Sequence, residues 1–277
     1  MDSPFISTEW LASHLHEPDV VVVDASWHLP NAARNAQAEY LAGHIPGAVF
    51  FDIDGIADTS TDLPHMLPSP DEFARAVGAL GISQDMTIVI YDEVGLFSAP
   101  RVWWTFRTFG ARKVFMLEGG GPKWRAEKRP VEAGLVTRDR APFEAHFKSG
   151  ATVDFAAVLA NLRTRTAHVI DARPAPRFHG EVPEPRPGLK SGHIPGSLNV
   201  PVNLLTENGR LKSRQDLRAI FQERGVDLAR PIITSCGSGI TAVTLALALE
   251  QAGAGDVAVY DGSWAEWGAH KDAEIES

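Results

Sequence analysis

The chain has 277 residues, of which 44% are hydrophobic and 22% are charged, a composition close to that of globular proteins and a length that suggests two domains. A formal net charge of −9 opposes binding to nucleic acid. A membrane span needs about 18 consecutive apolar residues, and no apolar run approaches that length. The first residues lack the basic region and apolar core of a secretion signal, and a single cysteine cannot form an internal disulfide. We therefore expect a cytoplasmic protein without nucleic-acid or membrane partners.

The first half of the chain contains short apolar runs that end in carboxylates. Val20–Val23 leads into Asp24, and Ile88–Tyr91 leads into Asp92. Runs of this length, rich in β-branched residues, predict buried strands. Between them lies the segment Gly43-His44-Ile45-Pro46-Gly47-Ala48, which predicts a turn at its proline and glycine.

The second half of the chain repeats the first. The segment Gly192-His193-Ile194-Pro195-Gly196-Ser197 follows its first-half counterpart by 149 positions, and the apolar run His168–Ile170 ends in Asp171. Between the halves, Lys128 to Gly150 carries prolines, glycines and mixed charges without sustained periodicity. We therefore predict an N-terminal domain over 1–130, a linker over 131–150 and a C-terminal domain over 151–277.

Both halves have the same predicted order of strands, loops and helices. Alternating strands and helices predict an α/β fold, in which a mainly parallel sheet is flanked by helices. Ligands of such open sheets bind at the carboxyl ends of the strands. Asp24, Asp92, Asp171 and Cys236 would lie at those ends.

Only the second half contains a thiol. Cys236 follows the apolar run Pro231–Ser235 and opens the turn Cys236-Gly237-Ser238-Gly239-Ile240-Thr241, before a helix predicted over Ala242 to Gln251. The N–H groups of such a loop and of a first helical turn lack intrahelical partners and favour negative charge. A cysteine that only filled the core would need no glycine-bearing turn, so we interpret Cys236 as a reactive nucleophile. Asp92 stands at the corresponding position of the first half, where we expect it to hold its own loop.

Over nearly its whole length the chain resembles the tandem-domain sulfurtransferases of the rhodanese superfamily. The features that carry the resemblance are the Cys236–Thr241 loop, the paired His-Ile-Pro-Gly segments, Leu96–Arg101 followed by Trp103-Trp104, and the ending Tyr260–Trp264. The resemblance implies two rhodanese-like domains with the catalytic loop in the C-terminal one, and sulfur transfer through a persulfide on Cys236. No cofactor is implied, and the histidines lack the paired spacing of metal ligands, so we expect no metal site.

The residues after the cysteine indicate the sulfur donor. Members of the superfamily that use thiosulfate typically carry an Arg-Lys pair there, whereas Gly237 and Ser238 stand in this chain. The resemblance therefore implies 3-mercaptopyruvate as the donor and pyruvate as the product. Cationic loop side chains would offset the charge beside the transferred sulfur of thiosulfate, but 3-mercaptopyruvate carries its carboxylate at the far end from the sulfur.

Arginines set back from the cysteine loop could bind that carboxylate as a bidentate fork. Arg177 and Arg186 stand in a proline-rich segment, and the resemblance maps the carboxylate-binding arginines onto these two positions. Arg101, from the first half, is a further candidate. The alternative is that Arg177 and Arg186 are solvated charges or pair with Glu181 and Glu184.

The implied reaction has two steps. The Cys236 thiolate takes the substrate sulfur as a persulfide and releases the enolate of pyruvate, which is then protonated. Ser238 could place its hydroxyl near that charge, and the N–H groups of the loop could stabilise the persulfide anion. The residues that could donate these N–H groups are Gly237, Gly239, Ile240 and Thr241. The resemblance also implies a Ser-His-Asp proton relay, which maps onto Ser238 and His44, but Ala33 stands at the aspartate position. Because the motif recurs at His193, a structural role for His44 stays open.

Other functions also stay open. A thiosulfate sulfurtransferase would share most of the chain, and a non-enzymatic persulfide carrier would need Cys236 but neither Arg177 nor Arg186. A phosphatase of this fold would need an arginine six positions after the cysteine, where Ala242 stands, so we reject it. The sulfur acceptor, whether a thioredoxin-like protein, another thiol or cyanide, has no signature in the sequence.

Overall fold

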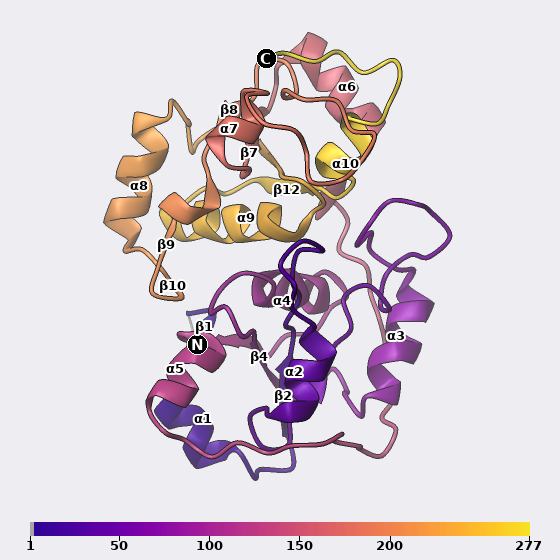
Figure 1. Cartoon of the computed structure of the whole chain (residues 1–277), viewed down its shortest axis with the longest axis vertical. Coiled ribbons are helices and arrows are strands. Elements are labelled where there is room, and N and C mark those ends of the chain that lie inside the picture. Colours follow the sequence, from indigo (N-terminus) through magenta and orange to yellow (C-terminus); the bar gives the residue numbers. More distant parts are fainter. Residues whose placement is uncertain (1–2) are drawn as a thin grey trace. The chain divides into compact units, whose positions relative to one another are not determined.

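The computed structural model describes residues 3–277, which form two compact units (Figure 1). The N-terminal unit runs to Thr59 and includes Leu67–Lys148 and Asn208–Arg210. The C-terminal unit comprises Ser60–Met66, Ser149–Glu207 and Leu211–Ser277. No helix within the described residues is long and apolar enough to cross a membrane.

The N-terminal unit alternates strands and helices, as predicted. Its strands are β1 (Phe5–Ile6), β2 (Val20–Asp24), β3 (Val49–Phe50), β4 (Thr87–Tyr91) and β5 (Val114–Leu117). Its helices are α1 (Thr8–His14), α2 (Ala36–Ala42), α3 (Pro70–Ala79), α4 (Ala99–Thr108) and α5 (Gly120–Ala126).

The C-terminal unit follows the same plan. Its strands are β6 (Thr152–Val153), β7 (His168–Asp171), β8 (Leu198–Asn199), β11 (Ile232–Ser235) and β12 (Val257–Tyr260), and a short hairpin is formed by β9 (Thr206–Glu207) and β10 (Arg210–Leu211). Its helices are α6 (Phe155–Thr164), α7 (Ala175–Phe178), the 3₁₀ turn η1 (Val202–Leu204), α8 (Arg214–Glu223), α9 (Ile240–Ala252) and α10 (Ser263–Trp267).

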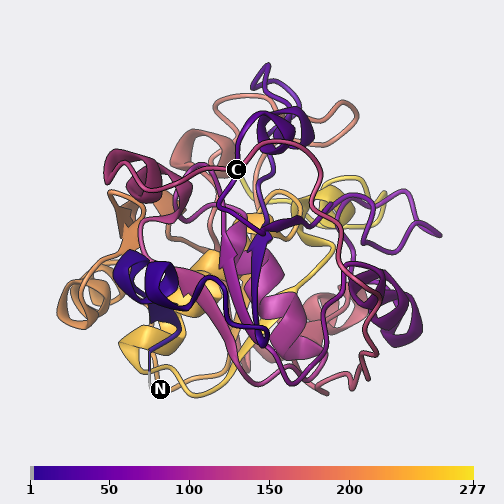
Figure 2. The ribbon, with the colours of Figure 1, turned by 90° about the horizontal axis from the view of Figure 1, so that it is seen from below.

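The two main sheets have equivalent topologies. The strand orders are β1-β5-β4-β2-β3 and β6-β12-β11-β7-β8, and every pair in them is parallel. Helices flank each sheet, and Figure 2 shows them on both sides of the N-terminal sheet. The internal repeat in the sequence is therefore a repeat of the whole fold, and the predicted fold class is confirmed.

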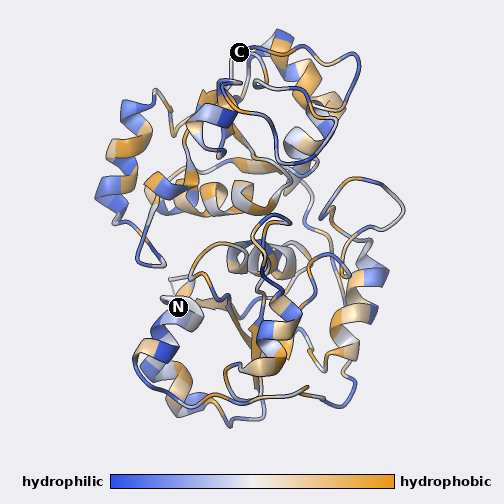
Figure 3. Cartoon of the chain, in the orientation of Figure 1, coloured by the Kyte–Doolittle hydropathy of each residue, from blue (hydrophilic) through white to orange (hydrophobic). Residues whose placement is uncertain are grey.

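Burial explains why the sequence of the central strands is apolar without alternation. All five residues of β2 are buried, as a strand covered by helices on both sides requires. Helix α9 is also apolar around its circumference, whereas α8 has one polar and one apolar face (Figure 3). The helix that follows Cys236 is thus enclosed by the core of its unit.

The segment predicted as a linker contains no helix and packs largely on the N-terminal unit. The Phe143 ring lies 5.4 Å from the Phe73 ring, and the Lys148 N–H donates to the Thr108 carbonyl over 2.8 Å. Two short segments also belong by contact to the unit formed by the other half of the sequence: Ser60–Met66 and Asn208–Arg210. Apolar anchors hold the segment even though it has no periodicity, and the domain boundaries themselves stay a prediction.

Candidate active site

The candidate nucleophile lies at the carboxyl end of a central strand. Cys236 directly follows β11, and β7 ends at Asp171 in the neighbouring position, paired with Ser235. Gly239, the N-cap of α9, has a positive φ of 81°, and the helix begins at Ile240, two residues earlier than predicted. Only 2% of the Cys236 surface is exposed. The loop thus presents a buried thiol at the start of a helix.

Residues of helix α10 hold the backbone of the cysteine loop by hydrogen bonds. The Cys236 N–H donates to Ser263 Oγ over 3.1 Å, and the Cys236 carbonyl accepts from the Trp264 N–H over 3.0 Å. The Gly237 carbonyl accepts from the Ala265 N–H over 2.9 Å. Among the described residues, by contrast, no protein acceptor engages the N–H groups of Gly237 and Ser238. These donors are available to an anion at the centre of the loop.

The N-terminal unit fills the equivalent loop with a carboxylate of its own. Asp92 follows β4 and is fully buried. Its two carboxylate oxygens accept five backbone N–H groups over 2.6–2.9 Å, from Val94, Gly95, Phe97, Ser98 and Ala99. The expectation that Asp92 holds its own loop is confirmed. The comparison also indicates that this loop geometry favours an anion in both units.

Arg177 lies against the cysteine loop and pairs with Glu184. Its Nε and Nη2 donate to the Glu184 carboxylate over 3.2 and 2.5 Å. Nη2 is 3.0 Å from the position that a Cβ on Gly237 would occupy. The pairing with Glu184 occupies one edge of the guanidinium, so the edge formed by Nη1 and Nη2 can still bind a carboxylate in bidentate fashion. The alternative that Arg177 pairs with Glu184 is therefore correct, and the pair engages only one edge of the guanidinium.

Arg186 contacts a histidine that the sequence did not bring to attention. The Arg186 Nη2 lies 3.2 Å from His65 Nε2. His65 is buried and belongs to Ser60–Met66, the short segment that packs into the C-terminal unit. A lone histidine far away in the sequence carries no signal that would place it beside Arg186.

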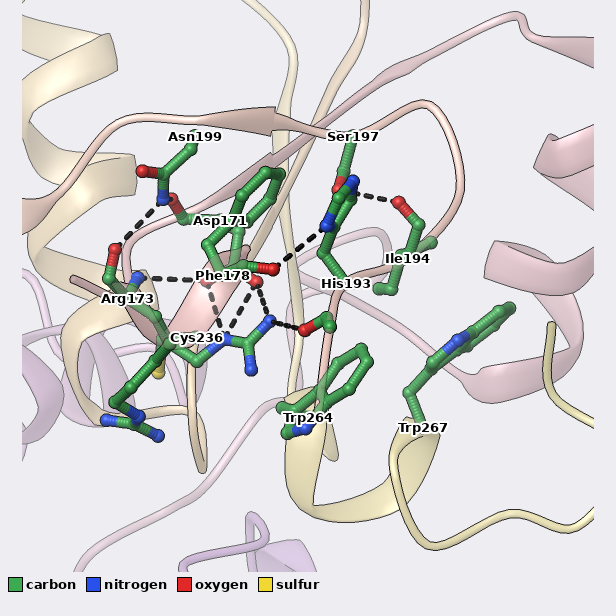
Figure 4. A network of polar contacts seen from close by, with 12 residues as sticks. Asp171, Arg173, Phe178, His193, Ile194, Ser197, Asn199, Cys236, Trp264 and Trp267 are labelled. Atoms are coloured by element: carbon green, nitrogen blue, oxygen red, sulfur yellow. Dashed lines mark hydrogen bonds and ion pairs between the residues drawn. The ribbon is translucent and has the colours of Figure 1, made fainter. Parts of the chain in front are cut away.

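Arg173 is the second residue that the sequence analysis missed. It follows Asp171 by two positions and is 1% exposed. Its guanidinium forms an ion pair of 2.7 Å with Asp171 and lies 4.2 Å above the centre of the Trp264 ring (Figure 4). Burial opposes its charge, but the attraction of Asp171 and Glu184 outweighs this effect and raises the pKa of Arg173 above its ordinary value. A charged residue two positions after a buried strand was the available signal.

The two repeated histidines have matching structural roles. His44 Nδ1 lies 2.8 Å from the Tyr40 carbonyl, and His193 Nδ1 lies 2.9 Å from the Phe178 carbonyl. Each ring stacks on that aromatic residue, and each backbone bridges to a glutamate near the end of its unit. The two differ at Nε2, which in His193 lies 3.7 Å from Glu276, whereas within residues 3–277 His44 Nε2 is buried without a hydrogen bond. The motif supports the fold in both halves.

The remaining predicted residues are divided between the units. Ser238 is 6% exposed and lies in the cysteine loop with Gly237 and Gly239. Ile240 and Thr241 are the first residues of α9. Arg101 lies on α4 of the N-terminal unit, where its guanidinium is 5.0 Å from the centre of the Trp104 ring. The structure therefore brings Arg177 and the cysteine loop together, and it places His44 and Arg101 in the other unit.

The repeated fold and a buried cysteine in a strand-to-helix loop define a class of protein with two rhodanese-like domains. The family model described as "Rhodanese-like domain" matches residues 7–127 and 154–270. The chain belongs to the rhodanese family.

Relatives that match across nearly the whole chain indicate which members of the family it resembles. The chain is 49% identical over 273 residues to "3-mercaptopyruvate sulfurtransferase" of Escherichia coli K12, with 98% of this chain and 97% of the relative covered. It is 46% identical over 270 residues to "Thiosulfate sulfurtransferase" of Rattus norvegicus, with 95% and 91% covered. A crystal structure of a 3-mercaptopyruvate sulfotransferase from Escherichia coli matches with a TM-score of 0.88 and 47% identity, over 95% of this chain and 99% of that one.

Proposed function

We propose that this protein is a 3-mercaptopyruvate sulfurtransferase that carries sulfur as a persulfide on Cys236. The observation that carries the proposal is the cysteine loop. Its thiol is buried, the N–H groups of the next two residues engage no protein acceptor within the described chain, and the Arg177 guanidinium lies against Gly237. The anion preference of this loop has support from Asp92, whose carboxylate fills the equivalent loop. The relatives named for this activity agree with it.

In the first step, the Cys236 sulfur attacks the donor sulfur. The new S–S bond forms while the C–S bond breaks, and its electron pair leaves as the enolate of pyruvate. The N–H groups of the loop are proposed to stabilise the persulfide anion, and the Ser238 hydroxyl to lie near the enolate, which takes up a proton. In the second step, an acceptor thiolate or cyanide attacks the outer sulfur and restores the Cys236 thiolate.

The donor carboxylate is assigned to Arg177 and Arg186. The Nη1/Nη2 edge of Arg177 supports this assignment, because the Glu184 ion pair leaves that edge open to a ligand. Arg101 stays a further candidate for donor binding. His44 stays the candidate histidine of the proton relay that the resemblance implies, with Nε2 as the atom that could carry the proton.

Thiosulfate is the second candidate donor, since a thiosulfate sulfurtransferase is about as similar to this chain as the 3-mercaptopyruvate enzymes. The loop argues against it: Gly237 and Ser238 are uncharged, and a longer side chain at 237 would meet the Arg177 guanidinium. The proposed acceptor is a thioredoxin-like or other thiol, or cyanide. The proposed location is the cytoplasm, and the proposed domains are 1–130 and 151–277, with the nucleophile in the second only.

The first experiment compares two donors on wild type and Cys236→Ser. Pyruvate release from 3-mercaptopyruvate and thiocyanate formation from thiosulfate and cyanide are measured at steady state. We expect a higher kcat/KM for 3-mercaptopyruvate and no turnover in the variant. A preference for thiosulfate would overturn the donor assignment and keep the nucleophile.

A second experiment separates an enzyme from a persulfide carrier. The double variant Arg177→Ala/Arg186→Ala should lose turnover of 3-mercaptopyruvate and still accept sulfur from a persulfide-bearing protein. Unchanged kinetics with 3-mercaptopyruvate in this variant would show that the arginines do not bind the donor.

A further inference from the structure

The Arg173 guanidinium is too fully engaged to bind substrate. Its Nε and Nη2 donate to the Asp171 carboxylate, and Nη2 also donates to the Gly192 carbonyl over 2.9 Å. Its Nη1 donates to Glu184 Oε1 over 2.8 Å, and its face covers the Trp264 ring. A buried cation with this set of partners is a fixed point of the C-terminal unit.

Glu184 connects this fixed point to Arg177. The Glu184 side chain is 2% exposed, and its carboxylate contacts both guanidinium groups, Arg173 on one side and Arg177 on the other. The order Asp171, Arg173, Glu184, Arg177 alternates in charge from the end of β7 outward. A flexible arginine at a surface would lose side-chain entropy on binding a ligand, and a buried carboxylate that already holds it reduces that loss.

The same Arg173 also reaches the cysteine loop through the tryptophan. The ring of Trp264 lies against Arg173, and the backbone N–H of Trp264 donates to the Cys236 carbonyl. In Figure 4 the Arg173 guanidinium lies between Asp171 and the Trp264 ring. One buried cation is therefore in contact with the supports of both the nucleophile and Arg177.

We propose that Glu184 and Arg173 are positioning residues for the sulfur donor: Glu184, held by Arg173, orients Arg177 so that its Nη1/Nη2 edge receives the donor carboxylate beside the Cys236 loop. This inference rests on the proposed function. It assigns no chemical step to either residue, and it predicts that both act through Arg177 on donor binding.

A double-mutant cycle tests whether Glu184 acts through Arg177. The proteins are wild type, Glu184→Gln, Arg177→Ala and the double variant, each assayed for pyruvate release from 3-mercaptopyruvate. Glu184→Gln keeps the shape and removes the charge, so we expect KM to rise about tenfold with kcat changed less than about threefold. In the Arg177→Ala background, Glu184→Gln should add no further increase in KM. An equal increase in both backgrounds, or an unchanged KM in the single variant, would overturn the proposal.

Three controls separate positioning from loss of fold. Loading of Cys236 with sulfur from inorganic polysulfide, which has no carboxylate, should be unchanged in Glu184→Gln when measured by mass spectrometry; reduced loading would indicate damage to the loop itself and overturn the proposal. Glu181→Gln, an exposed glutamate of the same segment, should match wild type. Glu184→Asp keeps the charge on a shorter side chain. If the glutamine variant does not fold, we expect the KM of Glu184→Asp to lie between those of wild type and Arg177→Ala. Wild type without any turnover of 3-mercaptopyruvate would refute the proposed function rather than the role of Glu184.

Discussion

Asp24 and Asp171 end equivalent strands, yet the two units surround them differently. Asp171 has the Arg173 guanidinium as its partner. Asp24 is buried, forms no ion pair among the described residues, and accepts hydrogen bonds from the Ser26 N–H and the Tyr91 hydroxyl. Burial raises the pKa of Asp24 to about 6, although these hydrogen bonds act in the opposite direction.

The raised pKa of Asp24 predicts a stability that depends on pH. An acid whose pKa is higher in the folded than in the unfolded state favours folding below its unfolded pKa, about 4, and loses this contribution as the pH rises through about 6. The loss corresponds to about 3 kcal/mol of unfolding free energy. Urea unfolding at several pH values should show a decline from about pH 4 to 6 in wild type that is weaker in Asp24→Asn. Equal slopes in the two proteins would refute the assignment.

Gly237 is the residue at which the loop most directly limits the donor. The Arg177 Nη2 lies 3.0 Å from the place where a side chain at 237 would begin, and the φ of Gly237 is not positive, so its backbone does not require glycine. Gly237→Arg should therefore fold and displace Arg177 by contact and by like charge. We expect KM for 3-mercaptopyruvate to rise about tenfold while activity with thiosulfate is retained or increases. Gly237→Ala is the matched control with a smaller effect, and an unchanged KM in Gly237→Arg would contradict the proposed position of the donor carboxylate.

At the scale of elements, the two strand-to-helix loops occupy equivalent places in their units but carry different residues. The loop after β4 directs its N–H groups at a carboxylate of the chain itself. The loop after β11 carries a thiol in that place. The carboxylate of Asp92 occupies the backbone donors of the first loop, whereas the Gly237 and Ser238 N–H groups of the second loop have no protein acceptor among the described residues.

Replacing Asp92 should destabilise the N-terminal unit. Asp92→Asn keeps the volume but places an NH₂ group against backbone donors, and buried N–H groups then lose their acceptor. We expect the unfolding free energy to fall by about 2–4 kcal/mol, measured by urea unfolding. Asp85→Asn, at an exposed position, should change it by less than about 0.5 kcal/mol. A stable Asp92→Asn protein would show that the loop does not depend on its carboxylate.

The repeated His-Ile-Pro-Gly segments allow a matched test of His44. Both histidines fix their turns through Nδ1, so His44→Asn and His193→Asn should lower stability to a similar extent. If His44 Nε2 carries a proton for the reaction, His44→Asn should in addition lower kcat for 3-mercaptopyruvate by at least about tenfold relative to His193→Asn. The same kcat in both variants would assign His44 to the fold alone.

At the scale of the whole molecule, one thiol in 277 residues sets the sulfur capacity. After incubation with 3-mercaptopyruvate, mass spectrometry of the intact chain should show a gain of one sulfur atom per chain, removed again by cyanide. Cys236→Ser should gain none. A gain of two sulfur atoms, or any gain in the variant, would require a carrier other than a single persulfide.

Most of the fold could be predicted because it depends on local patterns. Apolar β-branched runs predict buried parallel strands wherever they occur, and the repeat shows that two such units are present. The loop that carries Cys236 could be predicted for a similar reason, since the loop and the helix behind it are contiguous in the sequence. The contacts of His65 with Arg186, and of Phe143 with the N-terminal unit, could not, because no local pattern connects these distant residues.

The amino-acid sequence alone determined two α/β units, a thiol in only one of them, and arginines set back from that thiol. These properties follow from residue order, because periodicity and turn residues act over a few positions. The tertiary structure determined which charged groups are in contact. Glu184 forms ion pairs with both Arg177 and Arg173, and the Asp92 carboxylate accepts hydrogen bonds from the N–H groups of its own loop. The physical reason is that a buried charge needs a partner within hydrogen-bonding distance, and only the folded backbone determines which partner lies there.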